Sequence, residues 1–458
     1  MVQTQADANV QSGQSLPGPK GLPWLGNLLT ISRKGMYPMI RKSWDTYGDG
    51  FRIMLGGLSM NVFLKPDDIK HVFLTNRHKY GKRQAYDGIR MLVGNGLLTS
   101  EGDEWRERRR VMQPAFHRPS IMEMCSDMTD AGVRLLEDWE REYEDGQSIE
   151  IYSEMMHVTL DIIGRTLFNI DLSSSADKTA QAFHSALEIL SVRGNNLLNL
   201  PMSIPTPSNR KLKKALTTLD EMVFQLVQDR LKMDNPPKDL LSMLLAAKGE
   251  DGEPLPVEDV RDEIITMFLA GHETTAIALT WTWYLLAQHP EVEAKLHEEW
   301  DNVLGGRIPT SDDLANLPYT KMVFQESMRL YSPVWSNARD TLEQDLIRGY
   351  EVEKGSMVFI CPYLTHRHPD YWEDPDRFWP ERFNEVNSKG RHKYAYVPFS
   401  VGPRMCIGNH FSTFEAQLLL ATFGQKYRFA LDPKNPPEMN FQITLRPKDG
   451  LRVFMHKR

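Results

Sequence analysis

The chain has 458 residues, of which 41% are hydrophobic and 25% charged, and its formal net charge is −7 at pH 7. These proportions are those of a folded globular protein, so they exclude a disordered, collagen-like or membrane-saturated chain. The net negative charge argues against a surface devoted to nucleic acid, and we expect no nucleic-acid partner.

The cysteines and the N-terminal residues bear on the cell compartment. Cys125, Cys361 and Cys406 are too few and too scattered for a disulfide framework, which favours a reducing compartment, and we expect a cytoplasmic protein. Residues 1–15 are polar and contain neither the basic nor the apolar stretch of a signal peptide. They predict a disordered tail with no membrane anchor.

The first elements of the chain are an irregular segment and a small sheet. Residues 16–24 are rich in proline and glycine, which predicts a non-helical segment where the fold begins. Short apolar runs at 51–55 and 60–64 flank the pair Gly56-Gly57, and this pattern predicts two strands joined by a turn.

Amphipathic patterns between about residues 120 and 305 predict a mostly helical middle of the chain, with helices at 155–168, 180–190, 216–233 and 240–248. Residues 197–209 contain three prolines among apolar residues and precede a basic run at 210–214. They predict a mobile connection between helices. A lid over an apolar pocket, a surface that touches a membrane and a solvated loop all fit this pattern.

The longest apolar stretch covers residues 264–287 and has four polar residues, His272 to Thr275, in its middle. Polar residues there would be costly in lipid, so the stretch predicts a buried helix over about 256–288 rather than a membrane span. Such a helix is about 48 Å long at about 1.5 Å per residue. Frequent prolines in the last third of the chain predict short helices and strands there.

A cysteine-containing loop precedes an apolar helical pattern at 411–427. The loop reads Phe-Ser-Val-Gly-Pro-Arg-Met-Cys-Ile-Gly, from Phe399 to Gly408. A helix N-terminus favours a thiolate at Cys406, and the glycines let the backbone approach a bulky group. For an isolated cysteine, an inert structural role would be the simpler interpretation.

The loop resembles the haem-binding segment F-x-x-G-x-R-x-C-x-G of the cytochrome P-450 superfamily, and every fixed position matches. The resemblance implies haem b (iron protoporphyrin IX) with Cys406 as the axial thiolate ligand of iron. It implies that Phe399 packs beside the loop and that Gly402 and Gly408 permit a tight turn and close approach to the porphyrin. Arg404 would bind a haem propionate.

Two further motifs concern the fold around the haem. Glu326 and Arg329 form an E-x-x-R pair, which in isolation is usually a surface salt bridge. The segment Trp379-Pro-Glu-Arg-Phe resembles the meander motif of the same family. The resemblance implies that Glu326 bridges Arg329 and Arg382 in a buried cluster that stabilises the fold.

Residues 270–275 in the long helix resemble the oxygen-activation motif of the family. The resemblance implies that Ala270 and Gly271 leave room for dioxygen above the haem, and that Glu273 and Thr274 are the catalytic residues that deliver protons. The alternative is ordinary helix packing with a threonine hydroxyl bonded to a backbone carbonyl.

Further basic residues are expected near the haem. Trp105 and Arg109 resemble the W-x-x-x-R pair that binds haem propionates, and Arg339 occupies the position of a further propionate-binding arginine. Other basic residues are expected to form a surface face that docks an acidic electron donor, although a solvated run of charge would look the same. These residues are Lys82, Arg106, Arg108, Arg110, Arg391 and Lys393.

The resemblance covers essentially the whole chain and implies a soluble, bacterial-type haem-thiolate monooxygenase. The implied fold is mainly α with a smaller β-rich lobe, forms a single domain over residues 16–458, and holds haem between the long central helix and the cysteine loop. The implied reaction inserts one oxygen atom from O2 into a C–H or C=C bond. Electrons would come from a separate ferredoxin, flavodoxin or flavin reductase.

The expected substrate pocket is formed by residues 86–98, 269–270, 334–336 and 442–444. Most of them are apolar, which favours a lipophilic substrate such as a fatty acid or a terpenoid. Two alternatives remain open, because a fold does not determine a function. One is a haem-thiolate enzyme that uses peroxide, and the other is a non-enzymatic haem-based sensor or ligand-binding protein.

Overall fold

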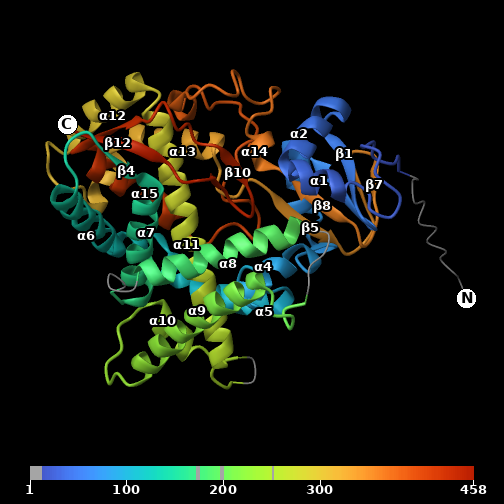
Figure 1. Cartoon of the computed structure of the whole chain (residues 1–458), viewed down its shortest axis with the longest axis horizontal. Helices are drawn as coiled ribbons and strands as arrows, with labels where there is room; N and C mark the ends of the chain where they lie inside the picture. The colour runs from blue at the N-terminus through green and yellow to red at the C-terminus, as the bar shows by residue number, and fades with distance from the viewer. Residues whose placement is uncertain (1–12, 172–175, 196–200, 250–251) are drawn as a thin grey trace, which may run out of the picture.

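The computed structural model describes residues 13–171, 176–195, 201–249 and 252–458. Helices form the larger part of the molecule, and a β-rich lobe with α1 and α2 lies at one end of it (Figure 1). The predicted fold class, mainly α with a smaller β-rich lobe, is therefore confirmed.

The helices are α1 (Leu28–Lys34), α2 (Met36–Tyr47), α3 (Pro66–Lys70), α4 (Asp87–Val93), α5 (Gly102–Met112), α6 (Arg118–Glu142), α7 (Ile151–Phe168), α8 (Ala176–Asn195), α9 (Pro207–Leu231), α10 (Leu240–Ala246), α11 (Val257–Leu286), α12 (Pro290–Val303), α13 (Pro318–Leu330), α14 (Pro362–Thr365) and α15 (Asn409–Gly424). All the predicted helices are present, and those expected from residues 155, 180 and 216 begin earlier, at Ile151, Ala176 and Pro207. The first turns of helices are commonly polar, so an apolar pattern misses them.

The strands are β1 (Gly50–Leu55), β2 (Leu58–Phe63), β3 (Tyr80–Gly81), β4 (Gln147–Glu150), β5 (Asn337–Thr341), β6 (Asp345–Ile347), β7 (Tyr350–Val352), β8 (Met357–Ile360), β9 (Tyr427–Leu431), β10 (Met439–Phe441), β11 (Leu445–Pro447) and β12 (Arg452–Lys457). The predicted pair of strands around Gly56-Gly57 is the antiparallel hairpin β1–β2. In the largest sheet the strand order is β1-β2-β8-β5-β3, so the hairpin pairs with strands from the last third of the chain.

Segments far apart in the chain pair at both ends of the molecule. β12 lies between β4 and β9 in a three-stranded sheet, which joins the C-terminus to the middle of the chain. At the other end, Gln14 forms backbone hydrogen bonds with Gly349 and Glu351 on either side of Tyr350. The paired chain therefore begins before residue 16, the expected boundary. Residues 1–12 of the predicted tail lie outside the described residues.

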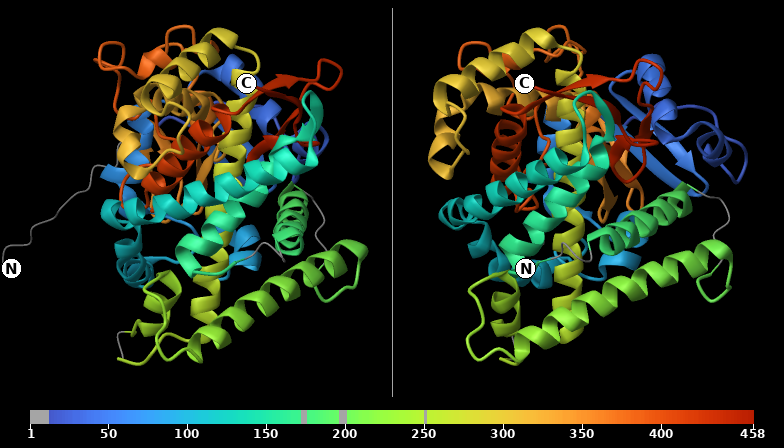
Figure 2. Two further views of the ribbon diagram at one scale, coloured as in Figure 1. Left: turned by 90° about the vertical axis from the view of Figure 1, so that its left-hand side faces the viewer. Right: turned by 60° about the vertical axis from the view of Figure 1, so that its left-hand side comes forward.

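Helix α11 is the predicted long helix and runs through the middle of the molecule (Figures 1 and 2). It follows Pro256 and carries Glu258 and Asp259 in its first turn, where negative charge is favourable against the helix dipole. It packs against α7, α13 and α15, and most of its side chains are buried. No helix among the described residues is long and apolar enough to cross a membrane.

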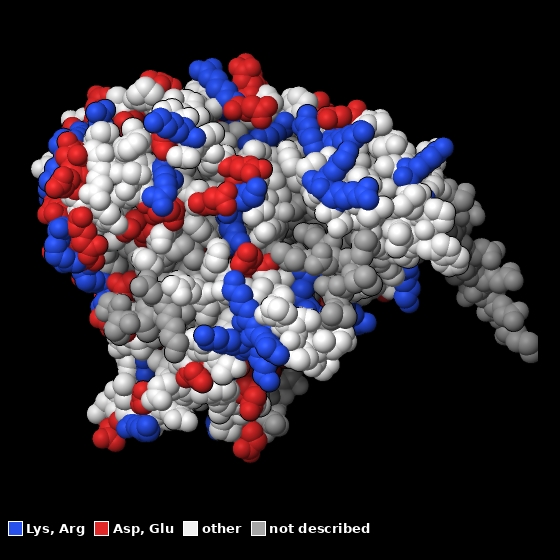
Figure 3. Space-filling model, viewed as in Figure 1, with Lys and Arg blue, Asp and Glu red and all other residues white. Residues whose placement is uncertain are grey.

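Helices α8 and α9 pack against each other, and α9 crosses one end of α11 (Figure 2). Basic side chains gather on the face over α9 (Figure 3), where Arg210, Lys213 and Lys214 line a surface hollow. Part of the predicted connection between the two helices, residues 196–200, lies outside the described residues. Whether this connection is a lid or a membrane contact therefore stays a prediction.

Candidate active site

The loop that ends at Gly408 is a tight structure held by its own backbone. The Cys406 N–H donates to the Phe399 carbonyl at 3.0 Å, and the Met405 N–H donates to the Gly402 carbonyl at 3.0 Å. Helix α15 begins at the next residue, with Gly408 as its N-cap. Cys125 and Cys361 are buried, whereas Cys406 is exposed. The loop therefore presents an accessible sulfur at the start of a helix.

The pKa of the Cys406 thiol reflects opposing influences. Desolvation by the surrounding protein raises this pKa overall, although the backbone N–H of Gly408 and the positive charge of Arg109 lower it. Both of the latter favour the thiolate form.

The two glycines of the loop differ in what the structure demands. Gly402 has φ of +78°, and a Cβ there would lie 2.5 Å from the Phe73 carbonyl oxygen, so only glycine fits. Gly408 has an ordinary backbone conformation, and a Cβ there would meet only Phe116, at 4.0 Å. The predicted tight turn therefore depends on Gly402 alone, and Gly408 leaves open space beside the cysteine.

A short accessible strip interrupts the buried surface of α11. Ala270 is exposed, and Gly271 and Thr274 are partly exposed, whereas the residues on either side of the strip are buried. Positions i, i+1 and i+4 share one face of a helix, so the three residues form a single wall. Gly271 also has a packing role that the sequence did not suggest, because a Cβ there would lie 2.5 Å from Ile163 Cδ1 on α7.

The hydroxyl of Thr274 donates to the Ala270 carbonyl at 2.6 Å. This is the back-bonded geometry that ordinary helix packing would also produce. The oxygen keeps lone pairs that can accept a further proton donor.

The side chain of Glu273 points away from Thr274. Its Oε1 accepts a hydrogen bond from Thr444 at 3.1 Å and lies 3.8 Å from Nη1 of Arg446. Burial raises the pKa of Glu273, and Arg446 and Thr444 lower it. No hydrogen bond joins Glu273 and Thr274 in the described part of the chain, so the two residues are neighbours in sequence but not in hydrogen bonding.

Helix α11 is tied to the cysteine loop through α15. Thr275 donates to Ser412 at 3.1 Å, and the Ser412 N–H donates to the Gly408 carbonyl at 2.9 Å. This connection holds the accessible strip of α11 and the loop of Cys406 in a defined relation.

Basic side chains gather on the other side of the loop. The guanidinium of Arg404 stacks on the ring of Trp105 at 4.0 Å, and Arg109 donates to the Met405 carbonyl at 2.7 Å. Arg339 is buried, donates to the Tyr86 hydroxyl at 3.1 Å and lies over Phe73. All four predicted propionate-binding residues therefore lie in or beside this cluster.

The cluster carries more positive than negative charge. Lys82 is buried, and burial together with Arg339 and Arg404 lowers its pKa. Burial and the repulsion of Arg339 lower the pKa of Arg404 to about 10, and Nη1 of Arg404 is buried with no hydrogen-bond partner among the described residues. Unpaired buried cations favour an anionic ligand. The two carboxylates of haem b are such a ligand, so these residues fit the expected cofactor.

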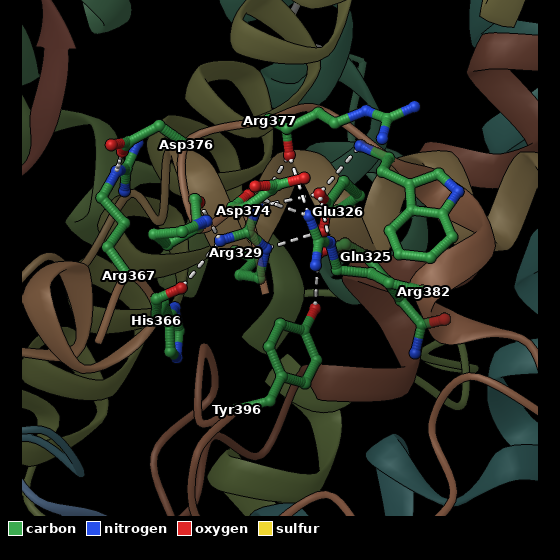
Figure 4. Close-up of polar contacts among 12 residues, drawn as sticks. Gln325, Glu326, Arg329, His366, Arg367, Asp374, Asp376, Arg377, Arg382 and Tyr396 are labelled. Carbon is green, nitrogen blue, oxygen red and sulfur yellow. Dashed lines mark hydrogen bonds and ion pairs between the residues drawn. The ribbon is translucent and has the colours of Figure 1, made fainter. Parts of the chain in front are cut away.

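A second charged cluster, formed by Glu326, Arg329 and Arg382, lies away from the surface (Figure 4). Glu326 accepts from Arg329 at 2.7 and 2.8 Å and from Arg382 at 2.8 Å. The arginines also donate to backbone carbonyls, among them those of His366 and Glu373, each at 2.8 Å. The structure thus brings together the three residues in the arrangement that the resemblance implies.

The predicted basic docking face is only partly correct. Arg106 and Arg110 are exposed, and with Arg109 and His117 they line a surface hollow on α5. Arg108, by contrast, is buried, because it pairs with Glu263 of α11 at 3.1 Å.

Two other residues of the expected face are also turned inward. Lys82 donates to the Leu98 carbonyl at 2.9 Å and belongs to the cationic cluster around Arg404. Arg391 is half-buried over the rings of Trp372 and Phe383. These charged residues were expected to face solvent, but Arg108, Lys82 and Arg391 instead find a buried acid, a backbone carbonyl and aromatic rings as partners.

The expected pocket residues divide into accessible and buried ones. Val334 and Ile443 are exposed apolar residues on two segments joined by hydrogen bonds, because Trp335 Nε1 donates to the Gln442 carbonyl at 2.7 Å. Trp335 and Thr444 are buried, so they support the wall rather than form its surface.

Two contacts of the site were not expected from the sequence. They are the ion pair of Arg446 with Glu273 and the hydrogen bond between Arg339 and Tyr86, a residue expected only in the pocket wall. Neither contact lies in a local motif, and only the fold brings the partners together. An unpaired buried charge such as Glu273 is the one signal that could have suggested a basic partner.

Comparisons with known proteins agree with this arrangement. The Cytochrome P-450 family model matches residues 16–453. A pentalenene oxygenase of Streptomyces avermitilis is 33% identical over 91% of this chain and 91% of its own, and a cyclooctat-9-en-7-ol 5-monooxygenase of Streptomyces melanosporofaciens is 32% identical over 90% and 88%. The crystal structure of the cytochrome P-450DA heme domain matches with a TM-score of 0.86 and 28% identity, over 98% of this chain and 99% of that chain. The chain therefore belongs to the cytochrome P-450 family, and it is a monooxygenase with haem b between α11 and the loop of Cys406.

Proposed function

We propose that this monooxygenase inserts one oxygen atom from O2 into a terpenoid-like lipophilic molecule. The observation that carries the proposal is the accessible strip of α11, tied through Thr275 and Ser412 to the loop that presents Cys406. Haem bound through Cys406 supplies the activation of dioxygen. The residues of the chain hold the cofactor, exclude water and deliver protons.

The cofactor is held from two sides in this proposal. The thiolate of Cys406 would bind the haem iron, and Phe399, Gly402 and Gly408 would shape the loop around that sulfur. Trp105, Arg109, Arg339 and Arg404 bind the propionates, since Nη1 of Arg404 is buried without a partner among the described residues and can donate to an anion. Ala270 and Gly271 form the opposite wall.

Thr274 and Glu273 deliver protons in this proposal. The oxygen of Thr274 is accessible and is held in place by its bond to the Ala270 carbonyl. Glu273 is the buried acid next to it, and it must rotate away from Thr444 to reach Thr274 or a bridging water.

The substrate class rests on the accessible apolar residues and on the relatives. Ala270, Val334 and Ile443 offer apolar contacts, which suit a molecule with few polar anchors. Two relatives are named for the oxygenation of pentalenene and of cyclooctat-9-en-7-ol, which are predominantly hydrocarbon. They favour a terpenoid over a fatty acid.

Electrons come from a separate ferredoxin, flavodoxin or flavin reductase in this proposal. The surface hollow lined by Arg106, Arg109, Arg110 and His117 lies beside the cysteine loop, because Arg109 reaches Met405. Complementary charge would steer an acidic donor to it. The free cysteines Cys125 and Cys361 fit a reducing, cytoplasmic location.

The carbon-monoxide spectrum and ligand binding test the proposal together. The reduced protein should give a haem-thiolate carbon-monoxide spectrum, and terpenoids should shift the ferric protein from low to high spin at lower concentration than fatty acids do. A fatty acid that binds more tightly would overturn the substrate class. An absent haem-thiolate spectrum would overturn the role of Cys406.

Replacement of Thr274 tests proton delivery. Thr274→Ala removes the hydroxyl, so we expect more peroxide and less product per electron pair. The rate of product formation should fall by a factor within the range of about 10²–10⁴ that general acid–base groups contribute. Thr274→Ser keeps the hydroxyl and serves as the control. An unchanged ratio of product to electrons in Thr274→Ala would contradict the assignment.

A further inference from the structure

Arg446 of β11 is a buried cation that joins three parts of the fold. Its Nη1 lies 3.2 Å from Nδ1 of His184 on α8 and 3.8 Å from Oε1 of Glu273 on α11. Its Nη2 donates to Oε1 of Gln442 at 3.1 Å. No local motif includes Arg446, and the family resemblance assigns it no role.

The two distances from Nη1 have different meanings. At 3.2 Å the guanidinium donates a hydrogen bond to His184, whereas 3.8 Å to Glu273 is an ion pair without a hydrogen bond. Arginine is always a donor, so Nδ1 of His184 must accept and the imidazole is neutral at this nitrogen. His184 therefore takes a hydrogen bond that the carboxylate of Glu273 would otherwise receive.

Other polar groups near this contact do not replace Arg446. Thr444 donates to Glu273 at 3.1 Å but carries no charge. The buried Tyr152 hydroxyl on α7 makes no hydrogen bond among the described residues, but it lies near both charges, since burial and Glu273 raise its pKa and Arg446 lowers it. On the side of His184, Glu188 of α8 and Lys211 of α9 are the nearby charges, and they pair with each other at 3.5 Å.

We propose that Arg446 is a positioning residue for Glu273, and that His184 competes with Glu273 for its hydrogen bond. While α8 holds His184 against Arg446, the hydrogen bond from Thr444 is the main contact of the Glu273 carboxylate. Breaking this one bond allows the carboxylate to rotate toward Thr274. When His184 is absent, Arg446 closes on the carboxylate and holds it away from Thr274. The position of α8 thus determines how easily Glu273 can rotate toward Thr274. This inference rests on the proton-delivery role of Glu273 proposed above.

The ionisation of Glu273 tests the competition without reference to turnover. Infrared difference spectra between each ferric variant and its Glu273→Gln counterpart report the carboxyl group as a function of pH. Arg446→Gln removes the stabilising cation, so the titration of Glu273 should move to higher pH by about one unit or more. His184→Phe keeps a ring of similar volume but cannot accept a hydrogen bond from Arg446. Arg446 should then approach the Glu273 carboxylate, and the titration of Glu273 should move to lower pH.

Two matched variants sharpen the result. His184→Gln restores a hydrogen-bond acceptor and should return the titration to the native value. Gln181→Ala changes an exposed residue one turn away on α8 and should change nothing. A shift in the same direction in Arg446→Gln and His184→Phe, or no shift in either, would overturn the proposal.

Product formation separates this inference from the proposed role of Glu273. His184→Phe should release more peroxide per electron pair, and His184→Gln should not. If Glu273→Gln itself leaves the ratio of product to electrons unchanged, the proton-delivery role fails, whatever the infrared titrations show. If Glu273→Gln uncouples the reaction but the titrations do not move in opposite directions, only the competition fails.

Discussion

The two buried charged clusters of this protein contrast in how completely their groups are paired. Glu326 has both oxygens occupied by Arg329 and Arg382, and the arginines donate to backbone carbonyls as well. The cluster around Arg404 holds Lys82 and Arg339 close by, and Nη1 of Arg404 has no partner among the described residues.

We expect this difference to separate a group that stabilises the fold from one that binds a ligand. In a buried network whose donors and acceptors are all paired, no group is free to bind a ligand. Removing one member leaves a buried charge without a partner. A buried cluster of like charges destabilises the protein when no ligand is bound, and a bound anion removes this destabilisation. Completeness of pairing therefore distinguishes structural from functional charge more clearly than burial does.

The largest expected effect is in the saturated cluster. Glu326→Gln removes the charge between two buried guanidiniums and turns an amide N–H toward a donor, so we expect a loss of about 3–5 kcal/mol in the free energy of unfolding. Urea denaturation followed by circular dichroism measures this loss.

A partly exposed pair gives the control for Glu326. Glu381 binds Lys295 near the surface, and Glu381→Gln should cost at most about 1 kcal/mol, the usual value of an exposed ion pair. Equal losses in the two variants would contradict the contrast between the clusters.

A smaller effect of a different kind is expected at Arg404. Arg404→Gln relieves repulsion with Arg339, so the unfolding free energy of the haem-free protein should not fall. Haem affinity should drop by about 10- to 100-fold, which corresponds to the loss of one hydrogen bond to a charged group, about 1.5–3 kcal/mol. Titration of the haem-free protein with haem measures the affinity.

The control for Arg404 lies on the exposed side of α5. Arg110 is exposed and lines the surface hollow, so Arg110→Gln should bind haem like the native protein. A haem-free Arg404→Gln protein that unfolds more easily would show that the cationic cluster is structural.

A pH-dependent effect is expected at the buried pair Arg108–Glu263. Burial raises the pKa of Glu263 to about 7, against the hydrogen bond from the Leu97 N–H and the charge of Arg108. Between the ordinary pKa of a glutamate and the raised pKa of Glu263, this residue is therefore protonated in the folded protein and ionised in the unfolded chain. Stability from this group is present at low pH and falls as the pH rises from about 4.5 to about 7, by at most about 1.4 kcal/mol per pH unit.

Comparison with Glu263→Gln isolates this contribution. The amide cannot titrate, so the difference in unfolding free energy between the native protein and the variant should change over that pH range and stay constant above it. Urea unfolding at several pH values measures the difference. A difference that is independent of pH would contradict the raised pKa.

Local motifs predicted much of the fold and of the site. The loop from Phe399 to Gly408 and the long helix through Thr274 follow from short-range patterns, because turn geometry and helix periodicity are local properties. The orientation of charged side chains was less predictable. Arg108 was expected at the surface and lies against Glu263, and the hydrogen bond between Thr444 and Glu273 was not expected at all.

The sequence by itself determined the family, the loop that contains Cys406 and the order of the main helices, since each depends on contiguous residues. Only the tertiary structure decided that Gly271 makes room for Ile163, that Lys82 joins the cationic cluster and that Arg446 stands between Glu273 and His184. These relations join residues far apart in the chain. The free energy of each contact depends on how far its groups are desolvated and on which partners the fold brings within hydrogen-bond distance. A short sequence pattern indicates neither of these.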